Sequence, residues 1–304
     1  MREQGNKWMN AAKGARNDEF YTQLADIEKE LSHYKRHFKG KVVFVNCDDP
    51  YESAFVVYFS MNFEHLGLKA LIATHYKGGR GGKPPHILWY KGDKNGNRMP
   101  DIDEFIETMI GNGDFRSEEC IELLKMADIV VTNPPFSLFR EYVAQLIQYK
   151  KKFLIIGNLN AITYKDIFKH IKQNKLWLGC SYPKTFLKPD GSTQAFGNVC
   201  WFTNLHHRKR NEELILWKAY TKKDYPTYDN YDAINVDKVS DIPKDYAGTM
   251  GVPITFLDKY NPEQFEILGN EYDLHIEKGR GYVDGKRMYS RVFIKHRKVV
   301  KHAN

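Results

Sequence analysis

The sequence predicts an α/β fold, a doubly wound sheet of mostly parallel strands with a smaller C-terminal module. Short apolar, β-branched stretches alternate with helical patterns from about residue 26 to residue 204. A strand at 42–46, a helix at 52–66 and a strand at 68–74 form one βαβ unit, the repeat of a Rossmann-like sheet. Beyond residue 204 the periodicity weakens and Tyr, Asp and Lys become frequent, which indicates a separate region.

The other expected elements follow from spacing and turn residues. Ile27, Leu31, Tyr34 and Phe38 recur at helical spacing, so a helix is predicted at 26–38. Later helices are expected at 118–126, 137–149 and 165–174, and strands at 129–132, 153–156, 176–179 and 199–203. Residues 87–90 with the Asn-Gly-Asn turn at 95–97 predict a hairpin insertion.

Charge and hydropathy narrow the class of protein. The 304 residues carry 46 Lys and Arg against 38 Asp and Glu, a net charge of +8. This balance favours a polyanionic partner, although a soluble basic enzyme explains it equally well. The N-terminus lacks the apolar core of a secretory signal, and the apolar stretches are too short to span a bilayer, so a cytoplasmic protein without membrane contact is expected.

The four cysteines, Cys47, Cys120, Cys180 and Cys200, show no CxxC spacing and no accompanying His cluster. Neither a zinc site nor a disulfide framework is therefore expected, and no metal is predicted.

Three segments are distinguished by composition. Residues 1–16, with Lys7, Lys13 and Arg16, are expected to form a flexible basic N-terminal arm, and residues 17–204 hold the alternating pattern of one domain. The basic stretch at 206–210 marks the break, so residues 205–304 form the second region.

The strongest chemical signal is the run of Asn133, Pro134, Pro135 and Phe136, between a predicted strand and a predicted helix. Active sites of open α/β sheets lie at the carboxyl ends of strands. The Asn133 side-chain oxygen and the Pro134 carbonyl are two acceptors for hydrogen bonds from the two N–H groups of an aromatic amino group. The consecutive prolines stiffen the turn, and Phe136 offers a ring on which a base can stack. The alternative is a proline-rich turn without function.

This run resembles the motif of amino-methyltransferases, in which Asp, Asn or Ser precedes Pro-Pro and an aromatic residue. More closely, the chain resembles the EcoRI-type DNA adenine (N6) methyltransferase family, through the segments 17–23, 45–50, 113–117, 133–136 and 196–204. The resemblance implies an S-adenosylmethionine-binding catalytic domain over residues 17–204 and a target adenine flipped out of double-stranded DNA.

The resemblance also implies roles for particular residues. It assigns cofactor binding to Tyr21, Thr22, Cys47, Asp48, Asp49, Pro50, Asp114, Phe115 and Asn133. Cys47 to Pro50 replaces the usual glycine-rich motif, and the choice between Asp48 and Asp49 as the cofactor ligand stays open. Asp114 is either an acceptor for the cofactor adenine or a turn residue after Gly113. Trp201 and Phe202 are candidates for stacking on the target base beside Phe136, although core packing is the simpler account for at least one of them, because neighbouring residues of a strand face opposite sides.

DNA contacts are expected from basic residues. Lys77, Arg80 and Lys83 on a glycine-rich loop, the N-terminal arm and the basic C-terminal stretch are candidates for phosphate contacts, and residues 205–304 are the expected target-recognition region. A cognate restriction endonuclease is a possible partner, and a monomer would suffice for the reaction. Two alternatives stay open: a methyltransferase acting on RNA guanine or protein glutamine, and a catalytically inactive DNA-binding homologue.

Overall fold

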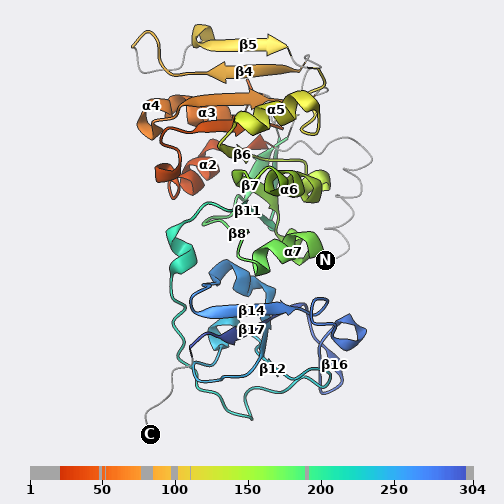
Figure 1. Ribbon diagram of the computed structural model, residues 1–304. Helices are drawn as coiled ribbons and strands as arrows, with labels where there is room; N and C mark the ends of the chain where they lie inside the picture. Colours follow the sequence, from red (N-terminus) through yellow and green to blue (C-terminus); the bar gives the residue numbers. More distant parts are fainter. Residues whose placement is uncertain are drawn as a thin grey trace. The chain divides into compact units, whose positions relative to one another are not determined.

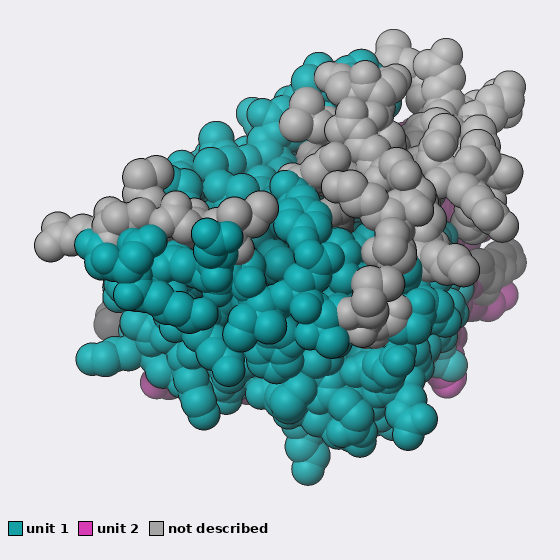
Figure 2. All heavy atoms as spheres, turned by 90° about the horizontal axis from the view of Figure 1, so that it is seen from above, with its two compact units in different colours: residues 1–169, 176–206 teal, residues 170–175, 207–304 magenta. Residues whose placement is uncertain are grey.

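The computed structural model describes residues 21–47, 50–51, 53–76, 85–96, 102–109, 111–188 and 192–298. The chain divides into two compact units, which Figure 2 colours separately. Unit 1 contains residues 1–169 and 176–206, and unit 2 contains residues 170–175 and 207–304.

Unit 1 is built on an eight-stranded sheet with the order β5-β4-β3-β2-β6-β7-β11-β8 (Figure 1). Its centre is parallel and consists of β3 (Ala70–Thr74), β2 (Val42–Val45), β6 (Ile129–Thr132) and β7 (Lys152–Asn158). Antiparallel strands extend both edges: β4 (His86–Tyr90) and β5 (Phe105–Met109) on one, β11 (Val199–Thr203) and β8 (Trp177–Leu178) on the other. The predicted doubly wound α/β sheet is therefore confirmed.

Helices cover both faces of this sheet, which explains why the central strands are continuously apolar. On one face, α2 (Leu24–Leu31) and α3 (Ala54–Met61) join the core cluster that includes Val43 and Val45 of β2. On the other face lie α5 (Glu118–Met126) and α6 (Phe139–Gln148). Neighbouring residues of β11 mark the two sides, since Trp201 contacts Phe55 of α3 and Phe202 contacts Phe139 of α6.

Some elements differ from the sequence prediction. The helix expected at 26–38 ends at Leu31, and a separate 3-10 turn follows at Lys35–His37. The helix expected at 52–66 is interrupted at Asn62, which separates α3 from α4 (Phe63–Leu66) before Gly67 ends it at φ +63°. A small antiparallel sheet of β1 (Tyr21–Thr22), β9 (Thr185–Leu187) and β10 (Thr193–Ala195) was not predicted, because strands of two or three residues leave little periodic pattern.

Unit 2 contains a four-stranded sheet in the order β12 (Ile234–Asn235), β13 (Met250–Pro253), β17 (Arg291–His296) and β14 (Phe265–Asn270). A two-stranded hairpin of β15 (Tyr282–Val283) and β16 (Lys286–Arg287) packs on it through a core with Tyr228, Val283 and Phe293. The helix α7 (Lys165–Lys172) crosses the division, because residues 170–175 belong to unit 2. None of the helices in the described part of the chain has the length and apolar character needed to cross a bilayer.

Candidate active site

The sheet of unit 1 has a topological switch point between β2 and β6. The chain proceeds from β2 to β3 on one side and later enters β6 on the other. Ligands of open α/β sheets bind at the carboxyl ends of strands at such a point. Asn46 and Cys47 follow β2, and Asn133 follows β6. The Thr132 hydroxyl donates a hydrogen bond to the Asn46 carbonyl, which ties the two strand ends together.

A buried hydroxyl orients the side chain at the end of β2. Tyr142 of α6 is fully buried and donates a hydrogen bond to Asn46 Oδ1. Burial, together with the nearby Cys47, raises the pKa of Tyr142 well above its ordinary value, so the hydroxyl stays a donor. Asn46 was not among the predicted site residues, although its place directly before Cys47 at a strand end was a usable signal.

Cys47 has a positive φ of +77°, in the left-handed region. Non-glycine residues rarely adopt this conformation, because it costs about 1–2 kcal/mol of conformational free energy per residue. The turn after β2 therefore has the backbone form that a glycine-rich motif supplies elsewhere, although the sequence provides no glycine. Asp48 and Asp49 lie outside the described residues, and Pro50 is buried.

The predicted catalytic run lies where β6 ends and α6 begins. Asn133 is 8% exposed, Pro134 is buried, and Pro135 and Phe136 are half-buried. The Leu138 amide donates to the Pro135 carbonyl at 3.0 Å, which starts the turn before α6. Within the described part of the chain, the Pro134 carbonyl accepts no backbone hydrogen bond outside the regular elements. Phe136 packs on the edge of the core cluster and keeps part of its ring exposed.

Residues 113–115 lie against the end of β3. Gly113 has φ +66°, and a Cβ at this position would be 1.8 Å from the His75 carbonyl oxygen, so only glycine fits. Phe115 is buried and meets the Tyr142 ring edge-on, with 5.0 Å between ring centroids. Tyr142 therefore contacts both the end of β2 and the predicted wall of the cofactor site.

Asp114 is held by Arg116. Asp114 Oδ1 accepts from the Arg116 amide and Nε, both at 2.9 Å, and Oδ2 accepts from Nη2 at 2.7 Å. These hydrogen bonds lower the pKa of Asp114 below its ordinary value. The bond from the Arg116 amide makes Asp114 a turn residue, which is one of the two roles considered for it. The ionised carboxylate also keeps acceptor capacity for a ligand amino group.

The other predicted site residues are distributed unevenly. Tyr21 pairs with Leu187 through the backbone of β1 and β9. The Thr22 hydroxyl is buried and has no hydrogen-bond partner among the residues that the structure describes. Trp201 and Phe202 are each 0% exposed, so both rings belong to the core here and neither offers a face to a base. Lys77, Arg80 and Lys83 lie outside the described residues.

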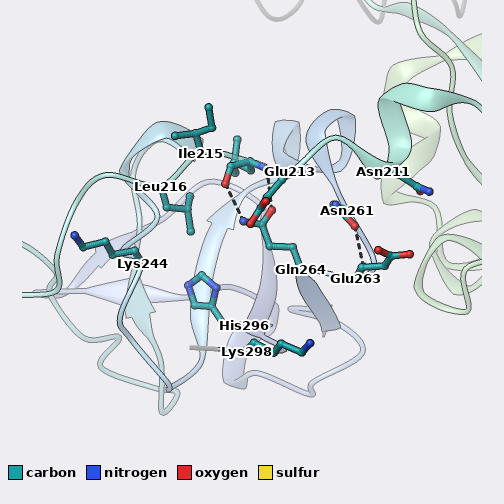
Figure 3. A pocket seen from close by; sticks show the side chains of 11 residues that line it. Asn211, Glu213, Ile215, Leu216, Lys244, Asn261, Glu263, Gln264, His296 and Lys298 are labelled. Carbon is teal, nitrogen blue, oxygen red and sulfur yellow. Dashed lines mark hydrogen bonds between the residues drawn. The ribbon is translucent and has the colours of Figure 1, made fainter. Parts of the chain in front are cut away.

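Unit 2 holds a groove of about 730 Å³ that contains none of the predicted site residues (Figure 3). Gln264, one of its lining residues, donates to the Leu214 carbonyl at 2.8 Å and accepts from the Leu214 amide at 2.9 Å. The groove is lined by Asn211, Glu213, Leu214, Ile215, Leu216, Lys244, Asn261, Glu263, Gln264, His296 and Lys298.

The basic residues of the C-terminal stretch have different surroundings. Arg291 is 6% exposed, donates to Asn235 and lies 3.5 Å from Asp237, so it is part of the fold. Lys286 and Arg287 on the hairpin strand β16 are exposed and remain accessible to a polyanion.

Comparisons with known proteins identify one family. A family model described as adenine-specific methyltransferase EcoRI matches residues 8–298. The Type II methyltransferase M.EcoRI of Escherichia coli is 46% identical over 97% of this chain and 98% of its own length. The Type II methyltransferase M.MpnI of Mycoplasma pneumoniae is 40% identical over 96% of this chain and 99% of its own. The Type II methyltransferase M.MgeORF184P of Mycoplasma genitalium is 38% identical over 95% of this chain and 99% of its own length. No solved structure matches.

Proposed function

The chain belongs to the family of the adenine-specific methyltransferase EcoRI, and we propose that it transfers a methyl group from S-adenosylmethionine to the amino group of an adenine flipped out of duplex DNA. It is an adenine-specific DNA methyltransferase, and its reaction requires a methyl donor. The observation that supports the proposal best is the position of Asn133 and Pro134, at the carboxyl end of β6 beside the switch point.

The residues at the strand ends fit S-adenosylmethionine. Thr22 has a buried hydroxyl without a partner in the described part of the chain, which suits a polar group of the methionine end. Asp114 offers an ionised acceptor for the cofactor adenine, and Phe115 forms the wall beside it. The proposed cofactor set is completed by Tyr21, Cys47, Asp48, Asp49, Pro50 and Asn133. When bound, the cofactor supplies an electrophilic methyl group on a sulfonium centre.

Asn133 and Pro134 are proposed to activate the target nitrogen. The lone pair of an adenine amino group is delocalised into the ring, so the nitrogen is a weak nucleophile. The Asn133 side-chain oxygen and the Pro134 carbonyl accept hydrogen bonds from its two N–H groups. These hydrogen bonds draw the nitrogen toward a tetrahedral form. Because the prolines fix the turn, these acceptors are preorganised for the charge that develops during transfer. The proton leaves afterwards, so no dedicated general base is needed.

Phe136 is proposed to hold the flipped base. Its partly exposed ring, supported from behind by the core cluster, offers a stacking face, and such stacking contributes about 1–3 kcal/mol per base. Phe136→Ala should therefore weaken catalysis less than Asn133→Ala, because stacking positions the base without activating it.

The remaining assignments concern DNA and partners. We propose that residues 205–304 read the target sequence and that Lys286 and Arg287 contact phosphates, with Lys77, Arg80 and Lys83 as further contacts from unit 1. A monomer would suffice for transfer to one strand at a time. A cognate restriction endonuclease and a cytoplasmic location stay predictions.

The test is methyl transfer from labelled S-adenosylmethionine to duplex DNA, followed by sequencing that maps methylated adenines. Methyladenine in a defined sequence is the expected result. Asn133→Ala should abolish transfer while DNA affinity is kept, and turnover at the wild-type rate would refute the mechanism. Label in RNA or protein would support those substrates instead, and cofactor binding without transfer to any of them would indicate an inactive homologue.

A further inference from the structure

Four polar side chains meet at the carboxyl edge of the sheet beyond β3. The Tyr51 hydroxyl donates to Glu107 Oε2 at 2.6 Å, and the Tyr51 ring lies against the His86 ring with 4.9 Å between centroids. His86 Nδ1 is 3.8 Å from Glu107 Oε1 and 3.1 Å from His75 Nε2. The catalytic chemistry proposed above uses none of these residues.

This cluster connects the two segments proposed to hold the cofactor. Tyr51 directly follows Pro50, where the segment after β2 ends. His75 directly follows β3, and its carbonyl oxygen lies against Gly113, the residue before Asp114. A continuous series of contacts therefore runs from one predicted wall of the cofactor site to the other, through strands β4 and β5 of the hairpin insertion.

We propose that Tyr51, Glu107, His86 and His75 are positioning residues that fix Pro50 relative to Gly113 and Asp114. The inference rests on the proposed function, since it assumes that the residues at both positions bind S-adenosylmethionine. The hairpin of β4 and β5 thereby acquires a role, because it carries His86 and Glu107 to this edge.

The burial of the four residues indicates how the network operates. His75 and His86 are 2% and 3% exposed and are fixed by packing, so they form a rigid platform. Tyr51 is 43% exposed, and the Glu107 side chain is 51% exposed, so their hydrogen bond is the part of the network that water can replace. A hydrogen bond to a charged acceptor is stronger than a neutral one, but exposure weakens it. Loss of this bond should therefore change cofactor affinity by roughly three- to tenfold.

The test begins with Tyr51→Phe, which keeps the ring on His86 and removes only the hydroxyl. The control is Tyr76→Phe, because Tyr76 is 55% exposed at the same edge of the sheet. Tyr51→Phe should raise the Kd for S-adenosylmethionine by roughly three- to tenfold and leave kcat at saturating cofactor unchanged. It should also speed amide hydrogen exchange of residues 46–58 in cofactor-free protein, whereas Tyr76→Phe should do neither.

Glu107 supplies the second half of the experiment. Glu107→Gln keeps an acceptor and should stay close to wild type, whereas Glu107→Ala removes the bond to Tyr51 together with the 3.8 Å contact to His86 and should weaken cofactor binding at least as much as Tyr51→Phe. The double variant Tyr51→Phe/Glu107→Ala should be no worse than Glu107→Ala alone, because both changes remove the same hydrogen bond. Additive effects, or exchange rates unchanged in Tyr51→Phe, would overturn the proposal. A wild-type protein that binds no S-adenosylmethionine would instead refute the proposed function, while the exchange rates would still report on the network.

Discussion

The buried carboxylate of Glu30 allows a quantitative prediction. Glu30 is 0% exposed and joins α2 to the chain after β8. Its Oε1 accepts from the Tyr34 hydroxyl at 2.9 Å and the Cys180 amide at 2.8 Å. Its Oε2 accepts from the Ser181 amide at 2.7 Å and the Ser181 hydroxyl at 2.6 Å. Burial and the nearby Glu30 raise the pKa of Tyr34 above its ordinary value, so that hydroxyl also remains a donor.

Glu30→Gln keeps the shape of the side chain but replaces one oxygen with an amide NH2. A hydroxyl can rotate and accept from this group, but a backbone N–H cannot. Each carboxylate oxygen of Glu30 accepts from one backbone N–H, so either orientation of Gln leaves one buried amide unsatisfied. This costs about 1–3 kcal/mol, and with the lost charge on the remaining bonds the total becomes about 2–4 kcal/mol. Because a whole domain is stable by only about 5–15 kcal/mol, the effect should be large.

The assay is urea unfolding followed by tryptophan fluorescence, since Trp89, Trp177 and Trp201 belong to unit 1. The matched control is Glu28→Gln, the same chemical change on the exposed face of the same helix, which should alter stability by less than about 0.5 kcal/mol. If the unfolding midpoints of Glu30→Gln and Glu28→Gln were equal, the carboxylate would not hold this loop as the geometry implies.

Gly113→Ala should abolish cofactor binding or destabilise unit 1, because the new Cβ would be 1.8 Å from the His75 carbonyl oxygen. A calorimetric titration with S-adenosylmethionine and a thermal melt measure the two effects. An unchanged Kd together with an unchanged melting temperature would refute the close approach. The double variant Lys286→Ala/Arg287→Ala should weaken DNA binding for all sequences alike. The slope of the logarithm of the binding constant against the logarithm of the salt concentration should become shallower by about 2, measured by fluorescence anisotropy between about 50 and 200 mM salt. An unchanged slope would exclude both residues as phosphate contacts. Burial holds the pKa of His296 below its ordinary value of 6.5, so the unfolded chain binds more protons and unit 2 should lose stability as the pH falls from 6.5 toward the folded pKa. Urea midpoints between pH 5 and 7, followed by far-UV circular dichroism, should show this loss, and His296→Gln should flatten it.

Much of the fold was predictable because its signals are local in the sequence. Strand β6 and helix α5 occur at the predicted residues, since an apolar β-branched run and an amphipathic run after Ser117 each determine their own conformation. The position of Asn133 between a strand and a helix was equally local. The interruption of the predicted helix at Asn62 was not apparent, because the apolar pattern continues across it into α4.

The candidate site depended more on tertiary structure. Trp201 and Phe202 had the right residue type for a base contact, but only packing showed that both rings are buried on opposite faces of the sheet. The left-handed conformation of Cys47 was also hidden, because nothing in the residue type demands it.

The class of fold, the order of its main elements and the proline-stiffened turn at Asn133 follow from local patterns of residues, because each depends on residues within about one helical turn or strand of each other. Which side chains contact one another depends instead on how the whole chain packs. Tyr142 and Asn46 are 96 positions apart, and Glu30 and Ser181 are 151 apart. Their hydrogen bonds depend on the register of strands and the packing of helices, which no local pattern of residues specifies.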